Sequence, residues 1–155
     1  MDILLNKDSV KRVKASLDEF DKSIKIQVLD QTARTANDAA KALSCEVGAI
    51  VKSLLIKTDN NFILCLISGD KRCSLNKLKK ILNKKDVAMA NADQVKENTG
   101  FSIGGVAPTG HLKKLNIIVD KSLSRFKYVY GAAGHPDCVF RITYPELVKL
   151  TIGSE

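Results

Sequence analysis

In the first part of the chain, apolar residues recur at helical spacing; after it, apolar and polar residues alternate as in a strand. From Ser9, apolar residues recur at every third or fourth position with lysines between them: Val10, Val13, Leu17 and Phe20. This spacing places them on one face of an amphipathic helix. Apolar and polar residues then alternate through Ile24, Ile26 and Val28, which predicts a strand.

Helix-cap residues mark the starts of four further helices. Each has a side-chain oxygen that can accept a hydrogen bond from the first helical turn: Thr35, Ser74, Asn91 and Thr143. Asp38 and Glu146 follow the two threonines at the spacing of a capping box. Gly100 is the residue type that best tolerates a left-handed helix end, so the helix after Asn91 is expected to stop there.

Further apolar segments, the first two of them β-branched and aliphatic, predict five more strands: 50–57, 62–68, 116–120, 127–132 and 138–142. Polar residues 59–61 predict a hairpin turn, and residues 134–136 are expected to separate the last two strands. Helices and strands interleave without a regular strand-helix-strand repeat, and no Pro/Ser-rich linker appears. The pattern therefore predicts a single α+β domain over residues 1–155.

The composition fits an aliphatic core with a basic surface. The 155 residues are 45% apolar, contain no Trp and carry a formal net charge of +8. This charge favours a polyanionic partner, although a lysine-rich protein that binds no nucleic acid fits it equally well. One short segment, with a helical apolar stripe, holds many basic residues: Lys71, Arg72, Lys77, Lys79, Lys80, Lys84 and Lys85. We expect a packed helix there with a basic outer face.

The cysteines and histidines do not predict a metal site. The four cysteines form no C-x-x-C pair, and the two histidines are His111 and His135. Cys65 lies in an apolar run, where cysteine usually acts as a small hydrophobic residue. No secretory signal precedes Val10, and no apolar run approaches the ~20 residues that span a bilayer. We expect reduced thiols, no metal, no cofactor, no membrane association and a cytoplasmic location.

Lys52 is the most informative single residue. In a strand, its neighbours on the same face are Ile50, Leu54 and Ile56, so its ammonium group starts from an apolar surface. That position is unfavourable unless a polar or anionic group meets the ammonium. The alternative is that the long side chain bends to the protein surface.

A glycine-rich loop spans residues 103–111. Its glycines allow backbone amides to approach a ligand closely, but it lacks the spacing of phosphate-binding and dinucleotide-binding loops. A plain turn is the alternative interpretation. His111 ends the loop, and either it or His135 can orient a substrate or transfer a proton, unless both are structural. Asp120 is a candidate catalytic carboxylate or the cap of the turn that follows it.

Five short motifs follow one another in a characteristic order along nearly the whole chain. They are Thr35 to Ala40, Ile50 to Leu54, Ser68 to Asp70, Thr99 to Pro108 and Ala133 to Pro136. Together they resemble the YbaK/EbsC-like family, which is related to the editing insertion of bacterial prolyl-tRNA synthetases. The resemblance implies an aminoacyl-tRNA deacylase with a curved, mixed and partly barrel-like β-sheet flanked by helices.

The resemblance also implies the site residues. The family's signature lysine maps onto Lys52, and its G-x-x-x-P loop maps onto Gly104, Gly105, Val106, Ala107 and Pro108. The aminoacyl end of tRNA is expected to enter a small pocket between this strand and this loop. Ser53, His135 and Asp120 are the candidate substrate-binding residues.

The implied reaction is hydrolysis of the ester of a mischarged tRNA, with a substrate hydroxyl or side chain assisting instead of a protein nucleophile. Backbone amides of the loop are expected to stabilise the oxyanion, while Lys52 positions the substrate. A small amino acid on proline tRNA or a related tRNA is expected, removed in trans or beside a synthetase. Ser53 and Ala107 argue against alanine and leave cysteine, serine, threonine or a non-proteinogenic residue open. The alternative is a non-catalytic tRNA-binding module of the same fold.

Overall fold

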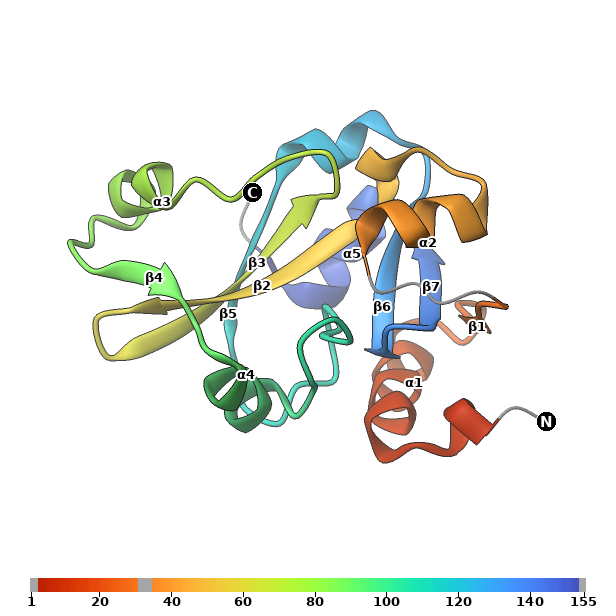
Figure 1. Cartoon of the computed structure of the whole chain (residues 1–155). Helices are drawn as coiled ribbons and strands as arrows, with labels where there is room; N and C mark the ends of the chain where they lie inside the picture. The colour runs from red at the N-terminus through yellow and green to blue at the C-terminus, as the bar shows by residue number, and fades with distance from the viewer. Residues whose placement is uncertain (1–2, 31–34, 154–155) are drawn as a thin grey trace.

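Two β-sheets lie next to each other with helices around them (Figure 1). The structure, a computed structural model, describes residues 3–30 and 35–153, so the ends of the domain expected over residues 1–155 lie outside it. The helices are α1 (Asp8–Phe20), α2 (Ala36–Leu43), α3 (Leu75–Leu82), α4 (Ala92–Thr99) and α5 (Tyr144–Thr151), with short 3₁₀ helices η1 (Ile3–Asn6), η2 (Val47–Ala49) and η3 (Lys121–Arg125). The strands are β1 (Ile26–Val28), β2 (Val51–Thr58), β3 (Asn61–Ser68), β4 (Val87–Met89), β5 (Asn116–Val119), β6 (Val129–His135) and β7 (Cys138–Ile142).

Each sheet has its own strand order. The first sheet runs β4-β2-β3-β5, with β5 parallel to β3 and the other pairs antiparallel. The second sheet, β1-β7-β6, is antiparallel throughout. An isolated parallel bridge between Ile50 and Tyr130 connects the start of β2 to β6. The α+β class with mixed strand directions is confirmed, and the two sheets do not close into a barrel.

The helix caps form where the sequence predicts them. The side chains of Thr35 and Ser74 accept hydrogen bonds from the third residue of their helices, at 3.1 Å and 3.2 Å. Thr143 forms the complete capping box that the sequence predicts with Glu146, and Asn91 forms a second one, whereas at Thr35 and Asp38 only the Thr35 half of the predicted box is present. Gly100 ends α4 in the left-handed region, with φ of +80°. Short-range polar contacts thus determine where these helices begin and end.

Two strands differ from the sequence-based expectation. The expected break at residues 134–136 lies slightly later in the structure: β6 continues to His135 through an irregular register between Ala132 and His135, and Pro136 and Asp137 form the turn to β7. Gly134, with φ of +90°, makes this irregularity possible. β4 was not predicted, because its three residues are too few to show a period; it pairs with the last part of β2.

Aliphatic side chains fill the space between the sheets and the first helix. α1 contributes three fully buried residues: Val10, Val13 and Leu17. They pack in one cluster with Leu64 and Leu66 of β3 and with Phe140 of β7. Cys65 faces a second cluster under α3, where burial, with a further contribution from Cys73, raises the pKa of its thiol to about 12. Cys65 is therefore a neutral core residue, as expected.

Replacing Phe140 with alanine is expected to lower the free energy of unfolding by about 3–5 kcal/mol, because the whole ring is buried. Phe20, at the end of α1, is 36% exposed, so Phe20→Ala is the matched control, with an expected loss of about 1 kcal/mol. Urea denaturation of both variants measures the difference. Equal losses would contradict the assignment of Phe140 to the core.

Candidate active site at the open edge of β2

The first half of β2 has one unpaired edge. β4 pairs only with Ile56 to Thr58. One further hydrogen bond follows directly after β4, from the amide of Ala90 to the carbonyl oxygen of Leu55 at 3.0 Å. Backbone groups of alternate residues point to the same side of a strand. The N–H and C=O of Ser53 therefore face the same side as those of Leu55, along an edge that no strand within residues 3–30 and 35–153 covers.

A cavity of about 330 Å³ lies against this edge. Its walls come from β2, the end of β4, the start of α2, the glycine-rich loop and the β6–β7 hairpin. Most of the lining is aliphatic. Among the described lining residues, Lys52 has the only charged side chain, and the other polar side chains are those of Thr35, Ser53 and Tyr130. A ligand in the cavity would therefore meet only these four polar side chains and the backbone groups of the described lining.

Lys52 lies on the face of β2 that α3 covers. Its neighbours on this face, Leu54 and Ile56, pack in the cluster beneath α3, as the alternation predicts. The ammonium group donates a hydrogen bond to the carbonyl oxygen of Lys71, in the segment after β3. The ammonium group of Lys52 thus meets a polar group on the α3 side of β2, although Lys71 itself does not line the cavity.

An ion pair that the sequence analysis missed holds this segment in place. Arg125 donates to both carboxylate oxygens of Asp70, at 3.0 Å and 3.2 Å, and to the hydroxyl of Ser68 at 2.9 Å. These hydrogen bonds, first from Arg125 and then from Ser68, lower the pKa of Asp70 to about 2. The geometry ties the end of β3 to η3. The Ser68 to Asp70 motif was the available signal, but nothing in it identified Arg125.

Two residues of the glycine-rich loop line the cavity and have unpaired backbone amides. Gly104 has a φ of +92°, which favours glycine, and it lines the cavity together with Val106. The amide of Gly105 donates to Ser102 at 3.0 Å. Within residues 3–30 and 35–153, the amides of Gly104 and Val106 have no hydrogen-bond acceptor. These two donors are available to a bound carbonyl group.

The loop packs directly against the Gly-His-Pro turn. A Cβ atom at Gly105 would lie 3.0 Å from the Cα atom of His135, and one at Gly104 would lie 3.6 Å from the ring of Pro136. The structure therefore brings two of the motifs together. Pro136 lines the cavity whereas His135 does not, and the Nδ1 atom of His135 accepts a hydrogen bond from Asp137 at 3.0 Å.

Both ends of the loop are held by α1. The guanidinium group of Arg12 donates to the carbonyl oxygens of Gly100, at 2.8 Å, and Gly110, at 3.3 Å. The same group lies over the ring of Phe101, 4.9 Å from its centroid. Arg12 was not among the predicted residues, because its partners are 88 and 98 residues away in the chain.

His111 holds the loop from within. Its Nε2 atom donates to the carbonyl oxygen of Ala107 at 2.7 Å, and its ring meets Phe101 edge-on at 5.9 Å. Burial lowers the pKa of His111 below its usual 6.5, despite the opposing effect of the Ala107 hydrogen bond. His111 does not line the cavity; its contacts hold the loop through Ala107 and Phe101.

The two remaining candidates, Ser53 and Asp120, lie in different surroundings. The hydroxyl oxygen of Ser53 is buried and has no hydrogen-bond partner among the described residues, although the residue lines the cavity. Asp120 lies outside this lining and caps η3, accepting hydrogen bonds from Ser122 and from the amide of Ser68. Burial acts to raise the pKa of Asp120, but these hydrogen bonds lower it overall. The capping alternative for Asp120 is thereby confirmed.

Comparison with known proteins identifies the family. The sequence model of the aminoacyl-tRNA editing domain matches residues 30–150. The chain belongs to this family of editing domains. It is similar to a proline-tRNA ligase of Thermosipho africanus, with 32% identity over 115 residues, which are 74% of this chain and 20% of the ligase. It therefore spans about a fifth of the length of that ligase.

Other relatives match this editing domain over most of its length. The protein YwhH of Bacillus subtilis is 26% identical over 144 residues, covering 92% of this chain and 91% of YwhH. A crystal structure of a protein proposed to be a trans-editing enzyme for prolyl tRNA synthetase superimposes with a TM-score of 0.90 at 36% identity, covering 96% of this chain and 94% of that one. The structure of the hypothetical protein APE2540 superimposes with a TM-score of 0.84 at 28% identity, covering 92% of this chain and 97% of that one.

His111 is expected to make the stability of the domain depend on pH. Because burial lowers its pKa below 6.5 in the folded state, the unfolded chain takes up this proton first as the pH falls. The free energy of unfolding should therefore decrease as the pH drops from 6.5 towards the lower pKa of the folded state. His111→Gln keeps a donor for Ala107 but does not titrate, so its decrease should be shallower. Urea denaturation between about pH 7.5 and 5 compares the two proteins; parallel curves would contradict the assignment.

Proposed function

We propose that this domain hydrolyses the ester between a small amino acid and a mischarged tRNA. One observation carries the proposal: a single, largely apolar cavity brings together Lys52, the open edge of β2 at Ser53 and the free amides of Gly104 and Val106. Such a cavity offers a polar anchor, an edge for the aminoacyl group and donors for a developing oxyanion.

The proposed chemistry is attack by water on the ester carbonyl. The water oxygen bonds to the carbonyl carbon, the bond from that carbon to the ribose oxygen breaks, and the ribose oxygen takes up the proton that water loses. The amides of Gly104 and Val106 stabilise the negative charge on the carbonyl oxygen. Lys52 positions the substrate by charge and hydrogen bonding.

The lining supports substrate assistance. Among the described lining residues there is no Asp, Glu, His or Cys that could act as a general base or a nucleophile. The neighbouring ribose hydroxyl, or a polar group of the amino acid itself, then guides the attacking water. Catalysis by the protein consists mainly of positioning and oxyanion stabilisation.

The cavity supports selection by size and by one hydrogen bond. Its volume of about 330 Å³ lies at the small end for ligand sites. The buried, unpartnered hydroxyl of Ser53 favours an amino acid whose side chain can hydrogen-bond, because leaving a buried hydroxyl unpaired is unfavourable. We therefore propose serine, threonine or cysteine as the amino acid removed, in preference to alanine.

The relatives support proline tRNA as the carrier. This chain matches a fifth of a proline-tRNA ligase, and it superimposes over nearly its whole length on a protein proposed to be a trans-editing enzyme for prolyl tRNA synthetase. We propose that the domain acts in trans, on tRNA released from the synthetase or held beside it.

The deciding experiment measures deacylation of proline tRNA charged with Ala, Cys, Ser, Thr or Pro. Wild-type protein is expected to deacylate one of the small polar substrates, and Lys52→Ala is expected to lose about 10²-fold in rate through lost positioning. Lys57→Ala is the matched control, because Lys57 is an exposed lysine on the same strand that does not line the cavity. Full activity of Lys52→Ala, or intact esters with tRNA still bound, would favour a non-catalytic tRNA-binding module.

A second test concerns the loop. Gly105→Ala is expected to lower kcat by about 10–10²-fold, because its Cβ atom would lie 3.0–3.1 Å from the backbone of His135 and would displace the two donor amides. Ser102→Ala, at an exposed position directly before the loop, is the control. Equal kcat values for the two variants would contradict the role of the loop amides.

A further inference from the structure

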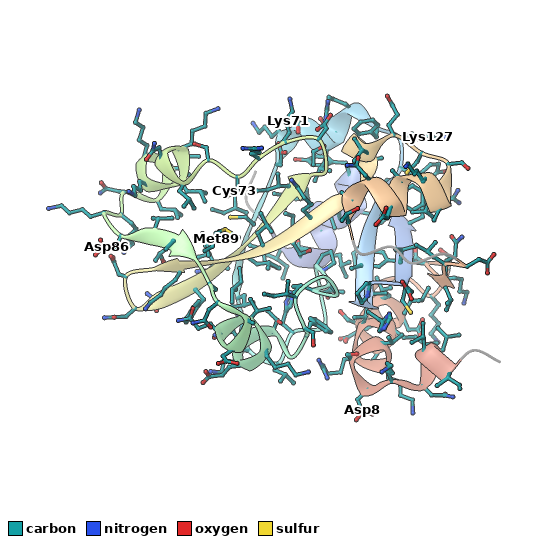
Figure 2. The ribbon with its side chains drawn as sticks, viewed as in Figure 1. Asp8, Lys71, Cys73, Asp86, Met89 and Lys127 are labelled. Atoms are coloured by element: carbon teal, nitrogen blue, oxygen red, sulfur yellow. The ribbon has the colours of Figure 1, made fainter. Side chains whose placement is uncertain are left out.

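The segment between β3 and β4 has an exposed basic surface that the proposed chemistry does not use. We call it the α3 basic face; its members are Lys71, Arg72, Lys77, Lys80, Lys84 and Lys85. Figure 2 shows long side chains that project outward from α3 and from the segment around Lys71. Of these six side chains, Lys84 alone forms an ion pair with a described residue, at 3.6 Å from Asp59.

This surface adjoins the cavity at both ends of its segment. At the start, the carbonyl group of Lys71 accepts the hydrogen bond of Lys52. At the end, the chain passes from Lys85 into β4, where Met89 lines the cavity. Leu78 is buried in the cluster beneath α3, so the helix packs on the sheet through its apolar side and presents its lysines outward.

The unpaired charges are unfavourable for the free protein. Like charges one turn apart on a helix repel each other, as Lys77 and Lys80 do, and no acidic residue lies in the first turn of α3. A row of phosphates would offset this repulsion and release counterions. The charge pattern therefore fits an anionic polymer better than a neutral partner.

The composition of residues 71–89 favours paired RNA over single-stranded RNA as the partner. Proteins that hold single strands usually stack bases on aromatic side chains. Residues 71–89 contain no Phe, Tyr or Trp. Paired RNA is instead recognised largely through its backbone and shape. The eight residues of α3 extend over about 12 Å, which is enough to meet several phosphates of one strand.

We propose that the α3 basic face binds the phosphates of the paired acceptor stem while the aminoacyl end of the same tRNA occupies the cavity. The inference rests on the proposed function for the choice of tRNA, but the contact itself is electrostatic and does not require ester cleavage. The unpaired end of a tRNA leads directly into its paired stem, so a protein that holds the terminal ester lies close to stem phosphates. The α3 basic face then contributes to affinity and leaves the chemical step unchanged.

The test compares two triple variants that remove the same charge. The first, Arg72→Gln/Lys77→Gln/Lys80→Gln, neutralises part of the α3 basic face. The control, Lys11→Gln/Lys22→Gln/Lys25→Gln, neutralises exposed lysines on or just after α1, at the other end of the molecule (Figure 1). The substrates are an aminoacylated minihelix, which contains the acceptor stem, and an aminoacylated CCA trinucleotide.

For the first variant, KM for the minihelix is expected to rise at least tenfold with kcat unchanged, while deacylation of the trinucleotide stays as in wild type. The slope of log kcat/KM against log salt concentration should become shallower by about 3, since roughly three phosphate contacts are lost. The control should match wild type on both substrates. Equal effects of the two triple variants, or an equal loss on the trinucleotide, would overturn the inference.

Binding of uncharged minihelix, measured by fluorescence anisotropy, separates this inference from the proposed function. If wild type cleaves no ester but only the first variant loses affinity for the minihelix, the proposed function fails and the RNA-binding surface stands. If wild type cleaves esters and both variants bind the minihelix equally, the proposed function stands and the α3 basic face is not a stem-binding surface.

Discussion

The unequal lengths of β2 and β4 are the constraint on which the site depends. β2 has eight residues and β4 has three, so in the described part of the chain the backbone groups near Ser53 have no neighbouring strand on that side. Proteins usually cover such an edge, because unpaired backbone groups are unfavourable and invite association. Here the open edge of β2 forms one wall of the cavity, and residues of the glycine-rich loop and of β6 form others. The polar backbone groups of this edge suit an extended aminoacyl group.

Local signals predicted much of this fold. The caps at Thr35, Ser74 and Asn91 depend on hydrogen bonds to residues three positions away, so a single sequence contains the whole signal. β4 lacked such a signal, since three residues show no period. The continuation of β6 through His135 depended on an irregular register with β7, which becomes visible only when the two strands are paired.

The site itself was predicted in part. Alternation placed Lys52 among apolar neighbours, and the family resemblance joined it to the glycine-rich loop; the structure brings both to one cavity. The residues that hold them were not found. Arg125 binds Asp70 across 55 positions, and Arg12 reaches the loop across nearly a hundred. Pairings of this kind leave no local pattern in one sequence, because their geometry exists only after the sheets have assembled.

The packing of α1 on β6 has a consequence for how the protein is made. The hydroxyl of Ser9 donates to the carbonyl oxygen of Gly134 at 2.9 Å, 125 residues away, and β1 pairs with β7 near the other end of the chain. During synthesis, the first helix therefore emerges from the ribosome long before its partner strand exists. Contacts between distant segments slow folding and leave apolar surface exposed meanwhile. The glycine-rich loop held by Arg12 also packs against the backbone of His135, so it can reach its final position only after β6 has been made.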